Sequence, residues 1–153
     1  MKCVVLENIR SAHNVGSVFR TADGAGVDEI FLVGYTPAPI DRFGRMQKEI
    51  QKTSLGASEW IPWRYFETVA ELVAYLEAEA IVLVAVEIAS QSISLKQFKV
   101  PDRVAYVLGN EVEGVSEAAL KAAATIVDIP MLGKKESLNV SVTAGIVLYH
   151  DVV

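Results

Sequence analysis

The chain has 153 residues, of which 52% are apolar and 22% charged, and this composition excludes a disordered or low-complexity protein. Its length is that of one domain with a single large core, so we expect residues 1–153 to form one domain. The net charge of −5 argues against a protein that binds nucleic acid tightly and without selectivity.

The first residues, MKCVVLENIR, reach an acidic residue too early for a secretory signal, and no apolar run is long enough to cross a bilayer. We therefore expect a cytoplasmic protein. The single cysteine, Cys3, can form no internal disulfide and has no second cysteine to share a metal with. We expect it to be a buried residue of the first strand and expect no metal site.

Positive charge is concentrated in the N-terminal part of the chain. Residues 1–64 contain eight Lys/Arg against seven Asp/Glu, whereas residues 65–153 contain six against twelve. An anionic partner should therefore meet the N-terminal half. The densest basic group is Arg42, Arg45, Lys48 and Lys52, for which a solvated surface is the alternative interpretation.

Short β-branched runs predict five strands, at residues 3–6, 29–33, 80–86, 104–108 and 125–129. Helical patterns lie between them. Gly26 is placed to end the first helix, and Thr68 and Ser116 are placed to begin two others. Nearly apolar strands that alternate with helices indicate an α/β fold with a doubly wound, mostly parallel sheet.

The segment of residues 34–62 has no clear periodicity, and we expect it to be one long irregular connection. Ligands of open parallel sheets bind outside the carboxyl ends of the strands, so the functional residues should follow the strands directly. Three polar segments do so.

The first segment, ENIRSAHNVGSVFRTADGAG, contains Arg10, Asn14 and Arg20 at the strand exit and on the helix face opposite the apolar stripe. An anion near this helix start would meet free N–H groups and two guanidinium groups, although both arginines could instead form surface salt bridges. Gly16 should allow another backbone to approach closely.

The second segment, GNEVEGVS, is a glycine turn that can present backbone groups to a ligand, and its Glu111 is either a site carboxylate or a turn residue. The third, MLGKKESLNVSVTAGIVLYH, begins with Ser137 and Asn139, which could cap a helix. That helix has apolar residues all round and small residues along it, so we expect it to be buried on every side and to suit a subunit interface.

In order and spacing the three segments resemble the three motifs of the SpoU (TrmH-like) family of the SPOUT superfamily, which are RNA ribose 2′-O-methyltransferases that use S-adenosylmethionine. NIRSAHNVGSVFRTADGAGV resembles the first motif, LGNEVEGVS the second and IPMLGKKESLNVSVTAGIVLY the third. The resemblance implies that the C-terminal part is threaded into a deep trefoil knot, although knots are rare. It also implies an obligate homodimer whose active sites draw on both subunits.

Carried over by position, the resemblance implies three sets of site residues. The catalytic set is Asn14, Arg20, Glu111, Ser137 and Asn139. The set that holds S-adenosylmethionine is Leu108, Gly109, Asn110, Glu111, Ile129, Met131, Ser137 and Leu138. For RNA contact we name Arg10 and Arg20 and add the basic group Arg42, Arg45 and Lys48.

The family's usual proposal makes Arg20 the base that takes the proton of the ribose hydroxyl. A free guanidinium is almost always protonated in proteins, so an equally physical role is to clamp the adjacent phosphate and polarise the hydroxyl. We leave both roles open. Methyl transfer from a sulfonium needs no metal, and positioning supplies much of the rate.

The chain lacks the flanking domains of some family members and is expected to be a near-minimal catalytic domain, which favours a tRNA over a ribosomal substrate. Trp60, Trp63 and Tyr35 could stack on bases, or the tryptophans could belong to the core. A rival hypothesis is a non-catalytic dimer that binds RNA or cofactor. A flavodoxin-like nucleotide-binding protein would need a phosphate loop that is absent.

Overall fold

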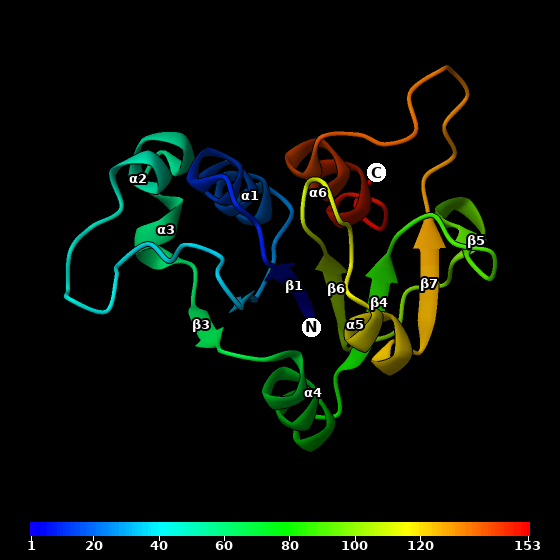
Figure 1. Cartoon of the computed structure of the whole chain (residues 1–153), viewed down its shortest axis with the longest axis horizontal. Coiled ribbons are helices and arrows are strands. Elements are labelled where there is room, and N and C mark those ends of the chain that lie inside the picture. Colours follow the sequence, from blue (N-terminus) through cyan, green and yellow to red (C-terminus); the bar gives the residue numbers. More distant parts are fainter.

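The computed structural model describes residues 1–153, and all seven of its strands belong to one sheet. The strands are β1 (Lys2–Glu7), β2 (Glu29–Val33), β3 (Trp63–Phe66), β4 (Val82–Val86), β5 (Ile93–Ser94), β6 (Val104–Leu108) and β7 (Thr125–Asp128). Their order is β3-β2-β1-β6-β4-β7-β5, and every neighbouring pair is parallel (Figure 1). The predicted parallel α/β sheet is confirmed.

Helices cover both faces of the sheet. They are α1 (Ala12–Gly24), α2 (Lys48–Ser54), α3 (Ala57–Trp60), α4 (Val69–Ala78), α5 (Glu117–Ala122) and α6 (Val140–Leu148), with a 3-10 helix η1 (Leu95–Gln97). One face carries α1, α2, α3 and α6, and the other carries α4 and α5 (Figure 1). The sheet is therefore doubly wound, as the sequence predicts. None of these helices is both long and apolar enough to span a membrane.

The core consists of two apolar layers because successive strand residues point to opposite faces. On β1, Val4 and Leu6 belong to a layer of 26 buried residues that includes those of α1 and α6. Cys3 and Val5 belong to the opposite layer of 14. Both faces are covered, which explains why the central strands are apolar throughout.

The C-terminal end of α1 has the geometry that the sequence predicts, and the structure adds an N-terminal cap at Ser11. Ser11 caps the first turn by accepting a hydrogen bond from the N–H of Asn14 (3.1 Å). At the other end Gly26 has a φ of +69°, and the N–H of Val27 reaches the carbonyl oxygen of Ala22 (2.9 Å). This is a Schellman ending, in which glycine adopts the left-handed conformation without strain.

The two predicted helix starts, at Thr68 and Ser116, are present. Thr68 accepts a hydrogen bond from the N–H of Glu71 (3.2 Å), and Ser116 accepts one from Ala119 (3.2 Å). The capping box at Thr68 differs in one detail, because the Glu71 carboxylate accepts from the N–H of Glu67 (3.1 Å) rather than from Thr68 itself.

The prediction that residues 34–62 are irregular is wrong, since α2 and α3 lie within them. Gly16 explains how α2 is held. A β-carbon at Gly16 would lie 1.8 Å from Thr53 Oγ1 and 2.7 Å from the carbonyl oxygen of Ile50. The predicted close approach at Gly16 is therefore confirmed, and it packs α2 against α1.

Two strands were not predicted, and both lie at the edges of the sheet. The strand β3 is only half-covered, so its sequence, WRYF, lacks an apolar run. The strand β5 has two residues, which is too short for any periodicity. Edge strands have weaker sequence signals because only part of their surface is buried.

The prediction that the last helix is buried on every side is wrong for the single chain. Val140, Ala144, Val147 and Leu148 of α6 are buried. Val142 and Ile146 are 50% and 41% exposed. An apolar strip of α6 therefore faces outward.

Cys3 is buried on β1 and forms no disulfide, as expected. Burial, and next the nearby Glu29 and Asp28, raise the pKa of its thiol from 9.0 to about 12. Burial also raises the pKa of Tyr106 from 10.0 to about 12. Between these values the unfolded chain releases protons that the folded chain retains, so the free energy of unfolding should fall as pH rises from 9 to 12.

Urea denaturation at a series of pH values measures this fall. Cys3→Ala should make it shallower, most clearly between pH 9 and 10, where the unfolded thiol loses its proton before the tyrosines do. An unchanged pH profile in Cys3→Ala would contradict the assignment.

Candidate functional site

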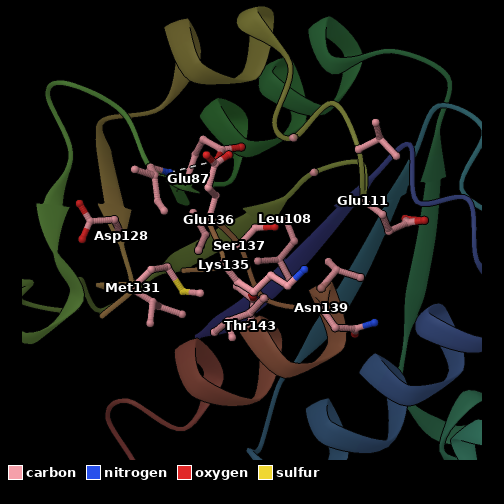
Figure 2. A pocket seen from close by; sticks show the side chains of 18 of the residues that line it. Glu87, Leu108, Glu111, Asp128, Met131, Lys135, Glu136, Ser137, Asn139 and Thr143 are labelled. Atoms are coloured by element: carbon pink, nitrogen blue, oxygen red, sulfur yellow. Dashed lines mark hydrogen bonds between the residues drawn. The ribbon is translucent and has the colours of Figure 1, made fainter. Parts of the chain in front are cut away.

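A cavity of about 1150 Å³ lies at the carboxyl ends of β4, β6 and β7 (Figure 2). Residues 109–114 after β6 form one wall, and residues 129–139 after β7 form another. The start of α6, with Asn139 and Thr143, closes a third side of the cavity. A cavity therefore lies where the sequence places the second and third segments, directly after the strands.

The turn after β6 depends on two glycines that pack backbone against backbone. A β-carbon at Gly109 would lie 2.2 Å from both the carbonyl carbon of Gly114 and the nitrogen of Val115. Gly114 has a φ of +75°, which favours glycine. No flexible side chain can move aside here, so this turn has one shape.

Asn110 fixes the same turn from within. It is 7% exposed, and its Oδ1 accepts from the N–H groups of Val112 and Glu113 (both 2.8 Å). Its Nδ2 donates to the carbonyl oxygen of Asn8 (2.9 Å) and to the hydroxyl of Tyr35 (2.8 Å). The cavity wall is thereby attached to the residues that follow β1 and β2.

Two carboxylates hold the residues that follow this turn, and sequence reasoning missed both. Glu7, at the end of β1, is 2% exposed and accepts from the N–H (3.0 Å) and hydroxyl (2.5 Å) of Ser116. Glu87, directly after β4, accepts from the N–H of Val115 (3.0 Å). The available signal was an acidic residue that ends an apolar run, once in VVLE and once in VAVE.

The first and second segments meet at Glu111. Its carboxylate accepts from the backbone N–H of Arg10 at 2.9 and 3.2 Å. Glu111 is thus held at the rim of the cavity next to the end of β1. The role of Glu111 as a site carboxylate stays a prediction.

The first and third segments meet at two asparagines. Asn139 Nδ2 donates to Asn14 Oδ1 (3.4 Å). Asn139 also caps α6, since its Oδ1 accepts from the N–H (2.8 Å) and the hydroxyl (2.6 Å) of Ser141. The expectation that Asn14 lies opposite the apolar stripe is wrong: Asn14 is 9% exposed, because α1 packs against α6 on that side.

All eight residues that are predicted to hold the cofactor line the cavity. They are Leu108, Gly109, Asn110, Glu111, Ile129, Met131, Ser137 and Leu138. In Figure 2 Leu108 and Ser137 lie in the middle, Glu111 and Asn139 toward α1, and Met131 on the opposite side. Whether these residues bind a cofactor remains a prediction.

Arg20 does not line this cavity. It is exposed on α1 and borders a second hollow of about 520 Å³. The other residues there are Ser17, Thr21, Gly24, Thr53 and Tyr149. Within one chain, Arg20 therefore lies outside the cavity that Glu111, Ser137 and Asn139 line. Asn14 does not line it either but bonds to Asn139 at its rim.

The basic group that is predicted to contact RNA also lies away from the cavity. Arg42 and Arg45 are in the turn before α2, and Lys48 is at its start. The guanidinium groups of Arg42 and Arg45 lie 4.8 and 5.0 Å from the centre of the Phe43 ring, which is 67% exposed. Arg45 Nε also pairs with Asp41 Oδ2 (2.9 Å). Hydrogen bonds from the Arg45 and Phe43 backbone N–H groups lower the pKa of Asp41.

The two tryptophans have different environments. Trp60 is 58% exposed, and its indole N–H donates to Asp23 Oδ1 (2.7 Å), so it is not a core residue. Trp63 is partly buried against the core. Tyr35 is 59% exposed, although its hydroxyl is engaged by Asn110.

The cavity has the chemistry that suits a cationic nucleoside. Its lining contains five carboxylates and two lysines, which favours a positively charged ligand. Leu108, Ile129, Met131 and Leu138 offer apolar surface for a flat ring. The chain contains no group of three His, Cys, Asp or Glu residues arranged to hold a metal.

Comparison with known proteins gives a consistent result. Residues 1–149 match the model of the SpoU rRNA methylase family. The chain is 32% identical over 145 residues to the 23S rRNA (guanosine-2′-O-)-methyltransferase RlmB of Neisseria meningitidis, covering 95% of this chain and 55% of that enzyme. It is 27% identical over 147 residues to the tRNA (guanosine(18)-2′-O)-methyltransferase of Escherichia coli, covering 96% and 61%.

Solved structures agree. The crystal structure of the AdoMet-bound rRNA methyltransferase from Sinorhizobium meliloti superposes with a TM-score of 0.88 and 27% identity, over 97% of this chain and 54% of that one. The chain thus spans less than two thirds of the length of these relatives.

Proposed function

The chain belongs to the SpoU rRNA methylase family, and from this we propose that it transfers a methyl group from S-adenosylmethionine to a ribose 2′-hydroxyl of RNA. The observation that carries the proposal is the cavity itself. Its walls are the second and third segments, and Arg10 and Asn14 of the first segment hydrogen-bond to its rim. Residues 1–153 would act as one domain around it.

S-adenosylmethionine would supply an electrophilic methyl group on a cationic sulfur. The apolar residues Leu108, Ile129 and Leu138 would receive the adenine, and backbone groups of the Gly109 turn would hold the remainder. Because the turn is fixed by Asn110 and by the Gly109 contact, little entropy is lost when it orients a ligand.

The ribose hydroxyl is a weak nucleophile that must lose its proton during attack. Arg20 would clamp the adjacent phosphate and polarise the hydroxyl, and the proton would leave to phosphate or water. A neutral Arg20 acting as the base is the alternative. Asn14, Glu111, Ser137 and Asn139 would orient the ribose, since Glu111 and Asn139 are already fixed by hydrogen bonds at the rim.

We propose that the active protein is a homodimer in which Arg20 of one subunit serves the cavity of the other. Arg20 lies on α1 outside its own cavity, and α6, which packs on α1, carries the outward apolar strip of Val142 and Ile146. A second subunit would cover this strip. We also propose that the C-terminal part of the chain is threaded into the trefoil knot, and that the protein acts in the cytoplasm.

Replacing both Val142 and Ile146 by glutamate should convert a dimer to a monomer, because burying two carboxylates without partners is costly. Sedimentation velocity at micromolar concentration measures the change, with Val112→Glu as a control at an apolar residue that is 80% exposed in the Gly109 turn. A wild-type monomer would contradict the dimer, and a double variant that stays dimeric would contradict its location.

We propose that RNA lies along the surface formed by Arg10, Arg20, Arg42, Arg45 and Lys48. Neutralising Arg42, Arg45 and Lys48 to glutamine should weaken RNA binding about equally for all sequences and reduce the salt dependence by about two to three units of slope. Filter binding between 50 and 200 mM salt tests this. Replacing Lys96, Lys99 and Lys121 removes the same charge elsewhere and should leave the slope unchanged.

The substrate class follows from one experiment. Protein is incubated with labelled S-adenosylmethionine and, separately, unmodified bulk tRNA and rRNA, and the nucleosides are then analysed. A labelled 2′-O-methylnucleoside from one pool would establish the reaction and choose between tRNA and rRNA. Cofactor binding without transfer to either pool would contradict the proposal and favour the non-catalytic dimer.

A further inference from the structure

Among the five carboxylates of the cavity, Glu87 is distinct because it is half-buried and each of its oxygens accepts from a different backbone N–H group. Glu111 is engaged by Arg10, and Asp128 accepts from the hydroxyl of Ser92 (2.5 Å). Glu113 and Glu136 are exposed. Glu87 is half-buried in the wall at the end of β4 (Figure 2).

Both oxygens of Glu87 are fixed by backbone donors. Oε1 accepts from the N–H of Ile88 (3.0 Å), and Oε2 accepts from the N–H of Val115 (3.0 Å). A carboxylate can accept about four hydrogen bonds, so about two acceptor positions remain. The side chain is therefore preorganised, and it has capacity for a ligand with two donors.

Glycine allows Glu87 to pack directly on the backbone of the turn. A β-carbon at Gly114 would lie 2.3 Å from Glu87 Oε2, and the φ of +75° at Gly114 itself disfavours any side chain. The carboxylate is therefore fixed against bare backbone in the cavity wall.

The position of Glu87 relative to the reacting end indicates which part of a ligand it meets. Glu111 and Asn139, at which we place the chemistry, lie toward α1, whereas Glu87 lies away from them in the view of Figure 2. The transferred methyl must point toward Glu111 and Asn139. Glu87 would then face the nucleoside.

We infer that Glu87 accepts hydrogen bonds from the ribose hydroxyls of the bound cofactor and thereby selects a ribonucleoside. This inference rests on the proposed function. A ribose presents two adjacent hydroxyl donors, which match a carboxylate with about two free acceptor positions. An acidic residue near a strand end plays the same part for the ribose of dinucleotides in other α/β sheets.

The test measures binding rather than turnover. Calorimetry compares S-adenosylhomocysteine with its 2′-deoxy and 3′-deoxy derivatives on the wild-type protein and on Glu87→Gln. The wild type should bind at least one deoxy derivative about tenfold more weakly, the size of a lost charge-assisted hydrogen bond. Glu87→Gln should lose most of this preference. Because a disturbed fold weakens all three ligands together, their ratio reports the ribose contact.

Glu113→Gln is the matched control, since it removes the same charge from an exposed position on the cavity. It should keep the wild-type preference. A third ligand, 5′-methylthioadenosine, retains the ribose but lacks the amino-acid part. If Glu87→Gln weakens S-adenosylhomocysteine but not this ligand, Glu87 binds the ammonium group instead, and the inference is overturned.

Failure of the inference can be told from failure of the proposed function. A wild-type protein that binds S-adenosylhomocysteine and both deoxy derivatives equally overturns the ribose contact alone, whatever the variants do. A wild-type protein that binds none of them overturns the proposed function as well. Equal preference in wild type and Glu87→Gln would assign Glu87 only to holding Val115.

Discussion

Arg20→Ala should lower kcat for methyl transfer by about a hundredfold to a thousandfold, the usual effect of removing one preorganised donor at a reacting oxygen. Arg20 is exposed and belongs to none of the four salt bridges, so its removal should leave the free energy of unfolding unchanged. Because Arg20 would contact the RNA phosphate and ribose rather than the cofactor, affinity for S-adenosylhomocysteine should also be unchanged. Single-turnover kinetics and calorimetry measure these quantities.

Arg20→Lys keeps the charge but loses the fork geometry that suits phosphate, so we expect it to recover only part of the rate. Arg103→Ala removes a charge at the opposite end of the sheet, just before β6, and should be nearly wild type. Turnover within a few fold of wild type in Arg20→Ala would show that Arg20 is neither base nor clamp.

A dimer permits a stricter test of Arg20. Random mixing of Arg20→Ala subunits with subunits damaged only in the cavity, such as Asn139→Ala, makes about half of the dimers mixed. If Arg20 acts across the interface, each mixed dimer has one intact site, so about a quarter of the wild-type activity should return. Mixed dimers that remain inactive would show that both residues serve the same subunit.

Gly109→Ala should be the most damaging small substitution in the chain. The added β-carbon would fall 2.2 Å from the backbone of Gly114 and Val115, where no side chain can move away. Overpacking of this kind costs about 1–3 kcal/mol or more, and relief by moving the turn would deform the cavity wall. We expect a lower free energy of unfolding in urea together with a large loss of affinity for S-adenosylhomocysteine.

Gly133→Ala is the matched control because it lines the same cavity but has nothing within 4 Å of its added β-carbon. It should bind S-adenosylhomocysteine normally. Equal behaviour of the two variants would mean that the contact of Gly109 with Gly114 does not set the shape of the site.

Much of the fold could be predicted because its signals are local. The central strands are continuous apolar runs since both of their faces are buried, and Ser11, Thr68 and Ser116 begin helices with hydrogen bonds that span three residues. The sequence did not predict the edge strands or the helices of residues 34–62. Their stability comes from packing, such as the contact at Gly16, rather than from their own hydrophobic patterns.

The candidate site also has features that the sequence predicts and features that only the structure shows. The three polar segments were visible because each directly follows an apolar run. The structure shows which of them meet, through Glu111 with Arg10 and through Asn139 with Asn14. Glu7 and Glu87 gave no distinctive signal, since a single carboxylate acquires a role only from the backbone N–H groups that the fold brings to it.

The sequence by itself determined the α/β class, the central strands, the helix caps and the family motifs, because each depends on neighbours within a few residues. Only the tertiary structure decided that Arg20 stands apart from the cavity, that α6 keeps an apolar strip outward, and that Glu87 is fixed in the cavity wall. Those three features depend on distances between residues far apart in the chain, which parallel crossovers set and local patterns do not encode.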